Sequence, residues 1–125
     1  MFKPHKIYIQ IRRNQVTAIN LVTGEEVMRQ ALTPFSTPRV VLASFGPAEE
    51  TIKAALRDLP LKRRFLAMNV IIQQMEGADG GLSDIEKRAL RDIAEMAGAN
   101  KVYIFEGIDK LSIPEALALI EKQRK

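Results

Sequence analysis

The fold is decided by the stretch Ser83–Gly107, which reads SDIEKRALRDIAEMAGANKVYIFEG. Ser83 and Glu86 form a Ser-x-x-Glu pair, which is typical of a helix start because each side chain binds an otherwise unpaired backbone N–H. Gly98 is placed to end the helix, and the β-branched and aromatic run Val102–Phe105 predicts a strand. A capped helix, a tight turn and a buried strand indicate half of a parallel βαβ unit. Apolar residues at steps of three and four predict the helix's buried stripe, which is Ile85, Ala89, Leu90, Ile93 and Ala97.

The first part of the chain alternates apolar and polar residues, the period expected of strands. Lys6–Ile11 and Val16–Val22 show this alternation, and a polar reversal at residues 12–15 joins them. A second turn at Thr23-Gly24 leads into a third strand at Glu25–Ala31. Three consecutive strands joined by tight turns predict an antiparallel meander.

The middle of the chain is predicted to hold a loop and then a helix. Prolines make residues 33–40 a loop, while Val40–Ala43 is read either as a short strand or as a segment tucked against the core. A helix is predicted to open at Phe45-Gly46-Pro47, since proline suits a first helical turn, and to end before Pro60. Its predicted buried stripe is Ile52, Ala55, Leu56 and Leu59.

Beyond this helix, Leu66–Ile72 is a nearly continuous apolar run, as expected of a central parallel strand. A polar loop is predicted over residues 73–81. A second Ser-x-x-Glu pair, Ser112 and Glu115, predicts the start of a last helix. We expect that helix to pack back on the sheet near Val102–Phe105, through Ile113, Leu117, Ala118 and Ile120.

The predicted element order is β-β-β-α-β-α-β-α, which indicates the α/β class with a mixed sheet. A meander followed by parallel βα units is the arrangement of the ribonuclease H-like fold, which each main subdomain of actin shares. We expect Ile9, Val70 and Ile104 to lie in adjacent central strands, with the helices of Ile52 and Ile93 packed on them. The 125 residues are enough for one core, so a single domain over residues 1–125 is predicted.

Composition excludes several classes of protein. At 46% apolar and 27% charged residues the chain is typical of a globular domain. The absence of cysteine excludes disulfides and thiolate metal sites, and His5 alone cannot build a zinc site. The apolar runs are too short to cross a bilayer and no signal peptide is recognised, so a cytoplasmic location is expected. The net charge of +4 favours simple solubility over attraction to phosphates.

Several of these segments resemble one protein family. EKRALRD at Glu86–Asp92 and AGANKVYIFE at Ala97–Glu106 resemble the first subdomain of the bacterial actin MreB, the rod-shape-determining family. FGPAEETIK at Phe45–Lys53 is similar to a helix of that family, and Lys6–Val22 to its first hairpin. The turn RRNQ at residues 12–15 is also similar to that of small bacterial stress-response proteins, which look like the same shortened actin unit.

The resemblance implies where a nucleotide site would lie, and this chain departs from it there. The family's first hairpin carries D-L-G-T, in which Asp supports magnesium and Gly lets phosphate approach; the run here is Gln10-Ile11-Arg12-Arg13. Gln10 has no charge for a hard cation, and Arg12 replaces the small glycine. Glu106 aligns with the first residue of a catalytic glutamate pair, but Gly107 follows it.

The second phosphate loop of that family, D-I-G-G-G-T, has no counterpart in this chain. A ribonuclease H-like nuclease would need clustered carboxylates for two metals, and that interpretation also fails at Gln10. We therefore expect no catalytic, metal or cofactor-binding residues, and no enzyme activity.

Other candidate sites are weighed against plainer interpretations. Residues 77–81 are glycine-rich and precede a helix, but a turn is favoured over a phosphate cradle because the Lys-Ser/Thr of a P-loop is missing. A solvated surface is favoured for the basic residues, and a patch for anions or a partner is the alternative. The methionines at 68, 75 and 96 are interpreted as core or rim residues. The basic residues concerned are Arg12, Arg13, Lys62, Arg63 and Arg64.

The leading hypothesis is a non-catalytic actin-like domain that binds another protein, either its own copy or a cytoskeletal protein. The surface would be the sheet edge or the helix faces, and the resemblance implies a role near cell shape or stress response. The alternative, which is less favoured, is a nucleic-acid- or anion-binding module that uses the basic loops. Strong loss of binding with salt would indicate this second class, because phosphate contacts release counterions.

Overall fold

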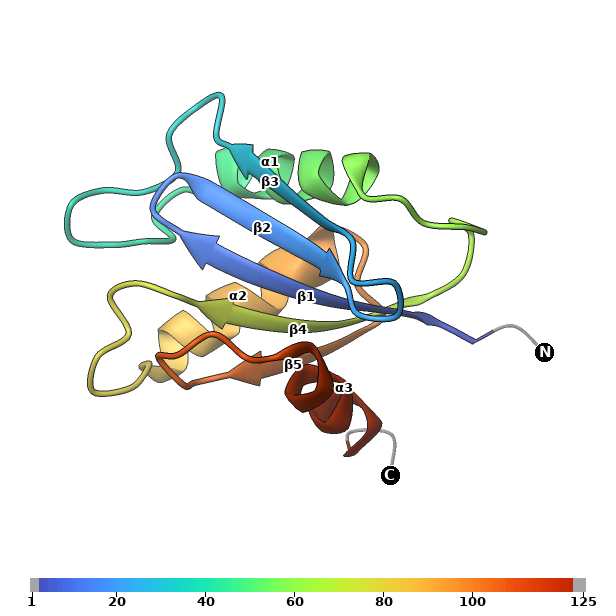
Figure 1. Cartoon of the computed structure of the whole chain (residues 1–125). Coiled ribbons are helices and arrows are strands. Elements are labelled where there is room, and N and C mark those ends of the chain that lie inside the picture. The colour runs from blue at the N-terminus through green and yellow to red at the C-terminus, as the bar shows by residue number, and fades with distance from the viewer. Residues whose placement is uncertain (1–2, 123–125) are drawn as a thin grey trace.

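The computed structural model describes residues 3–122 of the chain. Within them the structure has five strands and three helices, arranged as one sheet with helices on both sides (Figure 1). Along the chain these elements are β1 (His5–Arg12), β2 (Gln15–Asn20), β3 (Glu26–Gln30), α1 (Phe45–Asp58), β4 (Met68–Gln74), α2 (Asp84–Met96), β5 (Lys101–Phe105) and α3 (Ile113–Lys122).

The strands lie side by side in the order β3-β2-β1-β4-β5. The first three pair antiparallel, as the predicted meander requires, whereas β4 runs parallel to β1 and β5 parallel to β4. The predicted α/β class with a mixed sheet is therefore confirmed. Ile9, Val70 and Ile104 lie in the adjacent strands β1, β4 and β5, as expected.

Helices α1 and α2 cover one face of the sheet, behind it in Figure 1. Alternate residues of a strand point to the same face, so Ile7, Ile9 and Ile11 of β1 all pack toward these helices. Ile52 of α1 and Ile93 of α2 are completely buried against them. The predicted stripe of α1 is confirmed, since its four residues all lie in this core.

Helix α3 packs on the opposite face, in front of the sheet in Figure 1. Its Ala116 and Ile120 are buried against Tyr8 of β1 and Ile71 of β4. The helix thus returns to the sheet as predicted, but it lies over β4 and β1 more than over β5. Tyr8 and Ile71 on the central strands are completely buried on this face, whereas Tyr103 and Phe105 of β5 are only partly buried. An ion pair between Lys6 and Glu121 fastens the end of the helix.

Both predicted helix caps are present. The Ser83 backbone N–H donates to Glu86 Oε1 at 2.8 Å, and the Glu86 N–H donates to Ser83 Oγ at 3.2 Å. Ser112 and Glu115 make the same two bonds at 2.8 and 3.2 Å. The Ser112 backbone N–H, aided by the hydroxyl, holds the pKa of Glu115 below its usual value. Gly98 has a φ of 115°, which suits the expected end of α2.

The buried stripe of α2 differs from the predicted one. Ile85 is 82% exposed, while Leu90, Ile93 and Ala94 are buried. Each helical residue turns about 100°, so Ile85 lies roughly 140° around the helix from Leu90 and points away from the sheet. The prediction that Ile85 belongs to the core is wrong.

A similar correction applies to α3. Ala118 is exposed, and the buried alanine is Ala116. Ala118 is two residues from both Ala116 and Ile120, so it lies on the opposite side of the helix from these two. Ile113 and Leu117 are partly buried, as their spacing predicts.

Two boundaries in the middle of the chain also differ. Strand β4 extends to Gln74, so the loop predicted from residue 73 begins two residues later. Val40–Ala43 forms no strand; Val41 is buried, and the Ala43 N–H donates to Phe35 O at 2.8 Å. Of the two interpretations left open for this segment, the one tucked against the core is confirmed.

Candidate functional site

The position at which the resemblance to MreB implies a magnesium-supporting aspartate is closed to solvent. Gln10 lies on β1, on the sheet face that carries α3, and is 1% exposed. Its Oε1 accepts a hydrogen bond from Arg12 Nη1 at 3.0 Å. Within residues 3–122 its Nε2 has no hydrogen-bond partner. A buried neutral amide offers neither the charge nor the access that a hydrated magnesium ion needs.

Next to Gln10, a buried hydrogen-bond cluster joins the segment after β5 to the sheet. The Tyr8 hydroxyl donates to Gln73 Oε1 and accepts from the Leu111 N–H at 3.1 Å. Gln73 Nε2 donates to the carbonyls of Gly107 at 2.8 Å and Asp109 at 3.0 Å. Burial raises the pKa of Tyr8, although the Leu111 N–H lowers it, so the hydroxyl stays a donor at neutral pH.

This cluster occupies the place where an open α/β sheet usually binds a ligand. Such ligands bind outside the carboxyl ends of parallel strands, and here the ends of β1 and β4 are adjacent and parallel. The bonds from Gln73 fix residues 107–109 across that end. The segment that follows β5 therefore covers the carboxyl ends of β1 and β4.

Glu106 does not join Gln10. Gln10 pairs with Gln73, and Gln73 with Phe105, so these three side chains share one face of the sheet. Glu106 is one residue further and turns to the other side, where its Oε2 lies 3.6 Å from Lys87 Nζ of α2. The side chains of Gln10 and Glu106, which the resemblance would place in one active site, therefore lie on opposite faces of the sheet.

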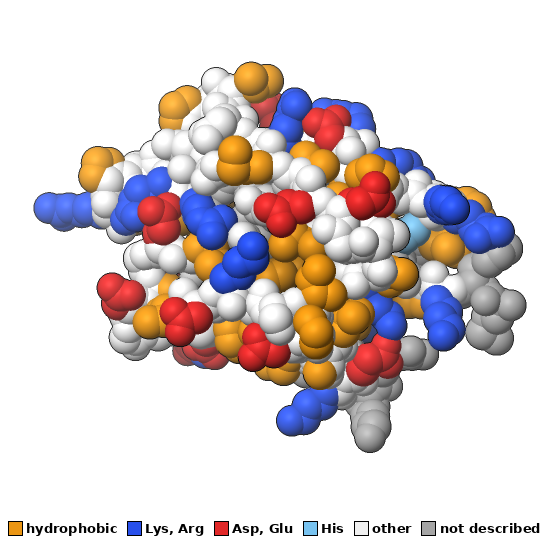
Figure 2. Space-filling view, in the orientation of Figure 1, with side chains coloured by type: hydrophobic (Ala, Val, Ile, Leu, Met, Phe, Trp, Pro, Cys, Tyr) orange, Lys and Arg blue, Asp and Glu red, His pale blue; other side chains and the backbone are white. Residues whose placement is uncertain are grey.

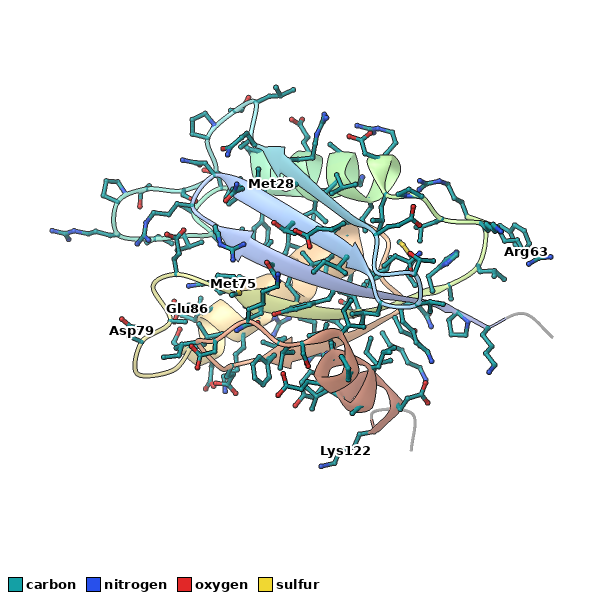
Figure 3. The ribbon with its side chains drawn as sticks, in the orientation of Figure 1. Met28, Arg63, Met75, Asp79, Glu86 and Lys122 are labelled. Carbon is teal, nitrogen blue, oxygen red and sulfur yellow. The ribbon has the colours of Figure 1, made fainter. Side chains whose placement is uncertain are left out.

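The two basic clusters lie at opposite ends of the sheet. Arg12 and Arg13 follow the carboxyl end of β1, whereas residues 62–64 precede the amino end of β4. Since β1 and β4 are parallel, these ends are the full length of the strands apart; Figure 3 shows Arg63 far from the loop that holds Asp79. The five basic residues do not form one patch.

Several of these basic side chains already have structural partners. Arg64 donates to three carbonyls at the carboxyl end of α1: Leu56 at 2.9 Å, Arg57 at 2.7 Å, and Leu59. Such contacts satisfy carbonyls that a helix leaves unpaired at its end. Arg13 Nη1 lies 3.8 Å from Glu76 Oε2.

The lone histidine also has a structural partner. His5 begins β1, and its Nε2 lies 3.0 Å from the Arg63 carbonyl oxygen. Within residues 3–122 no three His, Asp or Glu side chains are grouped so as to hold a metal ion.

The glycine-rich connection between β4 and α2 has the features of a turn. Gly77, Gly80 and Gly81 all have positive φ, a conformation that other residues adopt only with strain. Ala78 is buried and anchors the connection, while Asp79 lies at its exposed tip (Figure 3). An acidic tip does not favour phosphate.

The methionines lie at the rim of the core and do not form one common surface. Met68 is partly buried against the main core, and a Cβ on Gly98 would lie 3.1 Å from its Cε. Met75 is partly buried, while Met96 is 49% exposed. Figure 2 shows hydrophobic side chains gathered over α3, with charged ones around them.

The outer edge of β5 is open. In residues 3–122, β5 pairs with β4 on one side and with no strand on the other. The Asn100 N–H donates to Met68 O at 2.8 Å. The register of β4 and β5 turns the backbone groups of Lys101, Tyr103 and Phe105 toward β4. Those of Val102 and Ile104 point outward, and Arg91 Nη1 donates to Val102 O at 3.3 Å there.

Two shallow grooves follow this edge of β5. One is lined by Arg91 and Glu95 of α2, Tyr103 of β5 and Ile120 of α3, among others. The second continues along β5 toward Glu106, beside the first half of α2. The run Val102–Phe105 is only partly buried, so apolar surface lies beside backbone groups that pair with no other strand of residues 3–122.

The other edge of the sheet is protected. Strand β3 carries Glu26 and Arg29, and Arg29 Nη1 lies 2.9 Å from Asp58 Oδ2 of α1. Charged residues on an edge strand discourage pairing with another chain. In β5, Lys101 is the single charged residue that could discourage such pairing. The sequence predicted the sheet edge or the helix faces as a binding surface, and the strand order shows that β5 is one of the two edge strands.

Among residues 3–122, no helix has both the length and the apolar character needed to cross a bilayer. No family model matches the chain. The chain is 35% identical over 103 residues to the Escherichia coli (strain K12) protein named "Uncharacterized protein YjaA". The match covers 74% of this chain and 75% of that protein.

Proposed function

We propose that this chain, which belongs to the family of the Escherichia coli protein YjaA, is a non-catalytic domain that works by binding another protein. The observation that carries the proposal is the open edge of β5, where apolar side chains accompany backbone groups that pair with no other strand of residues 3–122. An edge of this kind binds an extended segment by adding it to the sheet, and the main-chain hydrogen bonds supply affinity.

The finer assignment of the fold to the ribonuclease H-like, actin-like group is part of this proposal. Its support is the sheet order β3-β2-β1-β4-β5, with an antiparallel meander on one side and parallel strands on the other. The resemblance to MreB implies a role in cell shape or the stress response, and a partner that is a copy of the chain or a cytoskeletal protein.

The absence of nucleotide chemistry is supported by the environment of Gln10. The side chain is a buried amide, and Arg12 binds it where the family has glycine. Residues 107–109 are fastened across the end of the strands by Gln73. A bound nucleotide would have to displace these buried bonds.

Magnesium and ATP are therefore expected to leave the melting temperature unchanged. A ligand at 100 times its dissociation constant stabilises a fold by about 2.7 kcal/mol, which would raise the melting temperature by roughly 10 °C in a domain of this size. The measurement is thermal unfolding with and without millimolar MgATP. An increase of several degrees would contradict the proposal, because it would mean that the closed site opens.

Protein binding at the β5 edge can be tested by photo-crosslinking in the native cell. A photoreactive amino acid at Tyr103 is expected to give a discrete crosslinked protein, since Tyr103 is the middle residue of the open edge strand and is only partly buried. The control position is Leu32, which is 94% exposed in the loop after β3. Equal crosslinking at both positions, or none at Tyr103, would count against binding at this edge.

A further inference from the structure

We propose that the partner of the β5 edge is β5 of a second copy of this chain, paired antiparallel about a two-fold axis. The inference rests on the proposed function and adds the identity of the partner. The two sheets would join into one continuous sheet, with α2 of both copies on the same face. Three features support this choice: the hydrogen-bonding register, the facing side chains, and the charges along α2.

The register is set by the outward backbone groups of β5. Those of Val102 and Ile104 point outward, and Tyr103, which lies between them, is the middle residue of the strand. A two-fold axis at Tyr103 pairs it with Tyr103 of the second copy, and pairs Lys101 with Phe105 at each end. The same axis pairs Val102 with Ile104 twice, and each of these two pairs would exchange two hydrogen bonds, so the strand would form about four. The Val102 carbonyl would exchange its bond from Arg91 for one of them.

This register also matches apolar side chains on both faces. On the face of α2, Val102 would lie opposite Ile104 of the second copy; on the face of α3, the two Tyr103 rings would meet. Aromatic and β-branched side chains facing each other across strands are favourable pairs. These side chains are only partly buried in a single chain.

On the side of α2 that faces the open edge, the charges of one copy are complementary to those of a second copy related by a two-fold axis. Lys87, Arg88 and Arg91 line one groove, together with Asp92, whose Oδ2 lies 3.8 Å from Arg88 Nε. Glu95 lies toward the end of the helix, beside the other groove. In a two-fold pair the two helices run antiparallel. Arg88 of one copy would therefore face Glu95 of the second, and the same contact would occur twice.

The spacing of the elements permits this contact. Helix α2 packs across β5 and β4. Its axis therefore lies about one strand spacing from the line along which the two β5 strands would join. Two copies joined edge to edge would place their α2 axes roughly 10 Å apart, which is the normal distance between packed helices. An unrelated extended segment could make the backbone bonds, but it would not bring a second helix with the opposite order of charges.

A cysteine at the two-fold axis tests the register directly. The chain has no cysteine, so Tyr103→Cys introduces a single thiol. Opposed residues in a non-hydrogen-bonded pair, as the two Tyr103 residues would be, have Cα atoms about 4.5 Å apart, within the range that a disulfide spans. We expect mild oxidation of dilute Tyr103→Cys protein to give a covalent dimer, and the exposed Ile85→Cys control to stay monomeric.

Charge reversal tests the helix contact without touching the core. The Arg88 side chain is 83% exposed, and Glu95 is exposed. In sedimentation equilibrium, Arg88→Glu is expected to raise the dimer dissociation constant by roughly tenfold, because like charges then meet twice. Adding Glu95→Arg should restore it, whereas Glu50→Arg on the exposed side of α1 should have no effect.

The outcomes separate this inference from the proposed function. A disulfide at Cys-substituted position 103 together with charge-reversal rescue supports self-pairing. A wild-type chain that stays monomeric at all concentrations, while the photoreactive residue at Tyr103 crosslinks to a protein of another mass, overturns self-pairing and leaves protein binding standing. A monomeric chain with no crosslink at Tyr103 overturns both.

Discussion

A chain that ends at Lys110 is expected to lose most of its stability and to associate in solution. The cut removes α3 together with Leu111, which is buried on the same face of the sheet. Tyr8 and Ile71, both completely buried in the whole chain, would then be exposed to water. Contiguous exposed apolar surface of this kind favours association.

The size of the effect follows from the residues that leave. Burying a Leu or Ile side chain stabilises a fold by about 1.5–3 kcal/mol, so Leu111 and Ile120 together contribute roughly 3–6 kcal/mol as an upper estimate. The Tyr8 hydroxyl would also lose the Leu111 N–H. A domain has only about 5–15 kcal/mol of total stability, so the loss is a large share of it.

Size-exclusion chromatography and thermal unfolding of the shortened chain beside the whole chain provide the test. The double change Ala116→Asp and Ile120→Asp is the matched control, because it keeps the chain length but places charges in the same buried face. Both proteins should show a lower melting temperature and a larger apparent size. If the shortened chain is as stable as the whole chain, α3 does not stabilise the sheet and is better regarded as an arm for a partner.

Ile93→Ala is expected to lower the free energy of unfolding by about 2–5 kcal/mol, the usual cost of removing a large side chain from a core. Ile93 is completely buried between α2 and the sheet, in the main core. The loss combines the transfer of the removed atoms with the cavity left behind, and the surrounding side chains relax only in part.

Ile85→Ala is the matched control for this prediction. It makes the same chemical change on the same helix, but Ile85 is 82% exposed, so the free energy of unfolding should change by less than about 0.5 kcal/mol. Urea unfolding of the two variants and the original chain measures both effects. Equal losses at the two positions would mean that α2 is rotated relative to the arrangement described above.

The comparison of Ile85 with Ile93 shows what periodicity in a sequence can predict. The repeat at three and four residues was enough to predict a helix over this stretch, because any amphipathic helix shows it. Two apolar stripes starting from Ile85 or from Leu90 fit that repeat almost equally well. Which of the two stripes is buried depends on the side of the helix that faces the sheet, and the periodicity of the sequence does not specify that side.

Local signals were the most reliable. The Ser83–Glu86 and Ser112–Glu115 caps lie within a single helical turn, and both are formed. The candidate site depended instead on residues far apart in the chain. Gln10 was predicted to be unfit for magnesium from its type. The buried cluster beside it could not be predicted in this way, because its hydrogen bonds join Tyr8 to Gln73 and to Leu111, which are far apart in the sequence.

Strand β1 is first in the chain but central in the sheet, and this has a consequence for synthesis on the ribosome. Its pairing with β2 needs only the turn at Arg13-Asn14. Its other side pairs His5 with Met68, which closes a loop of roughly 60 residues. At about 5–20 residues per second, translation leaves that side of β1 unpaired for about 3–12 s. During this interval the nascent chain exposes an isoleucine-rich strand edge. Whether the chain aggregates would then depend more on protection by a chaperone and on the distance to neighbouring nascent chains than on the stability of the finished fold.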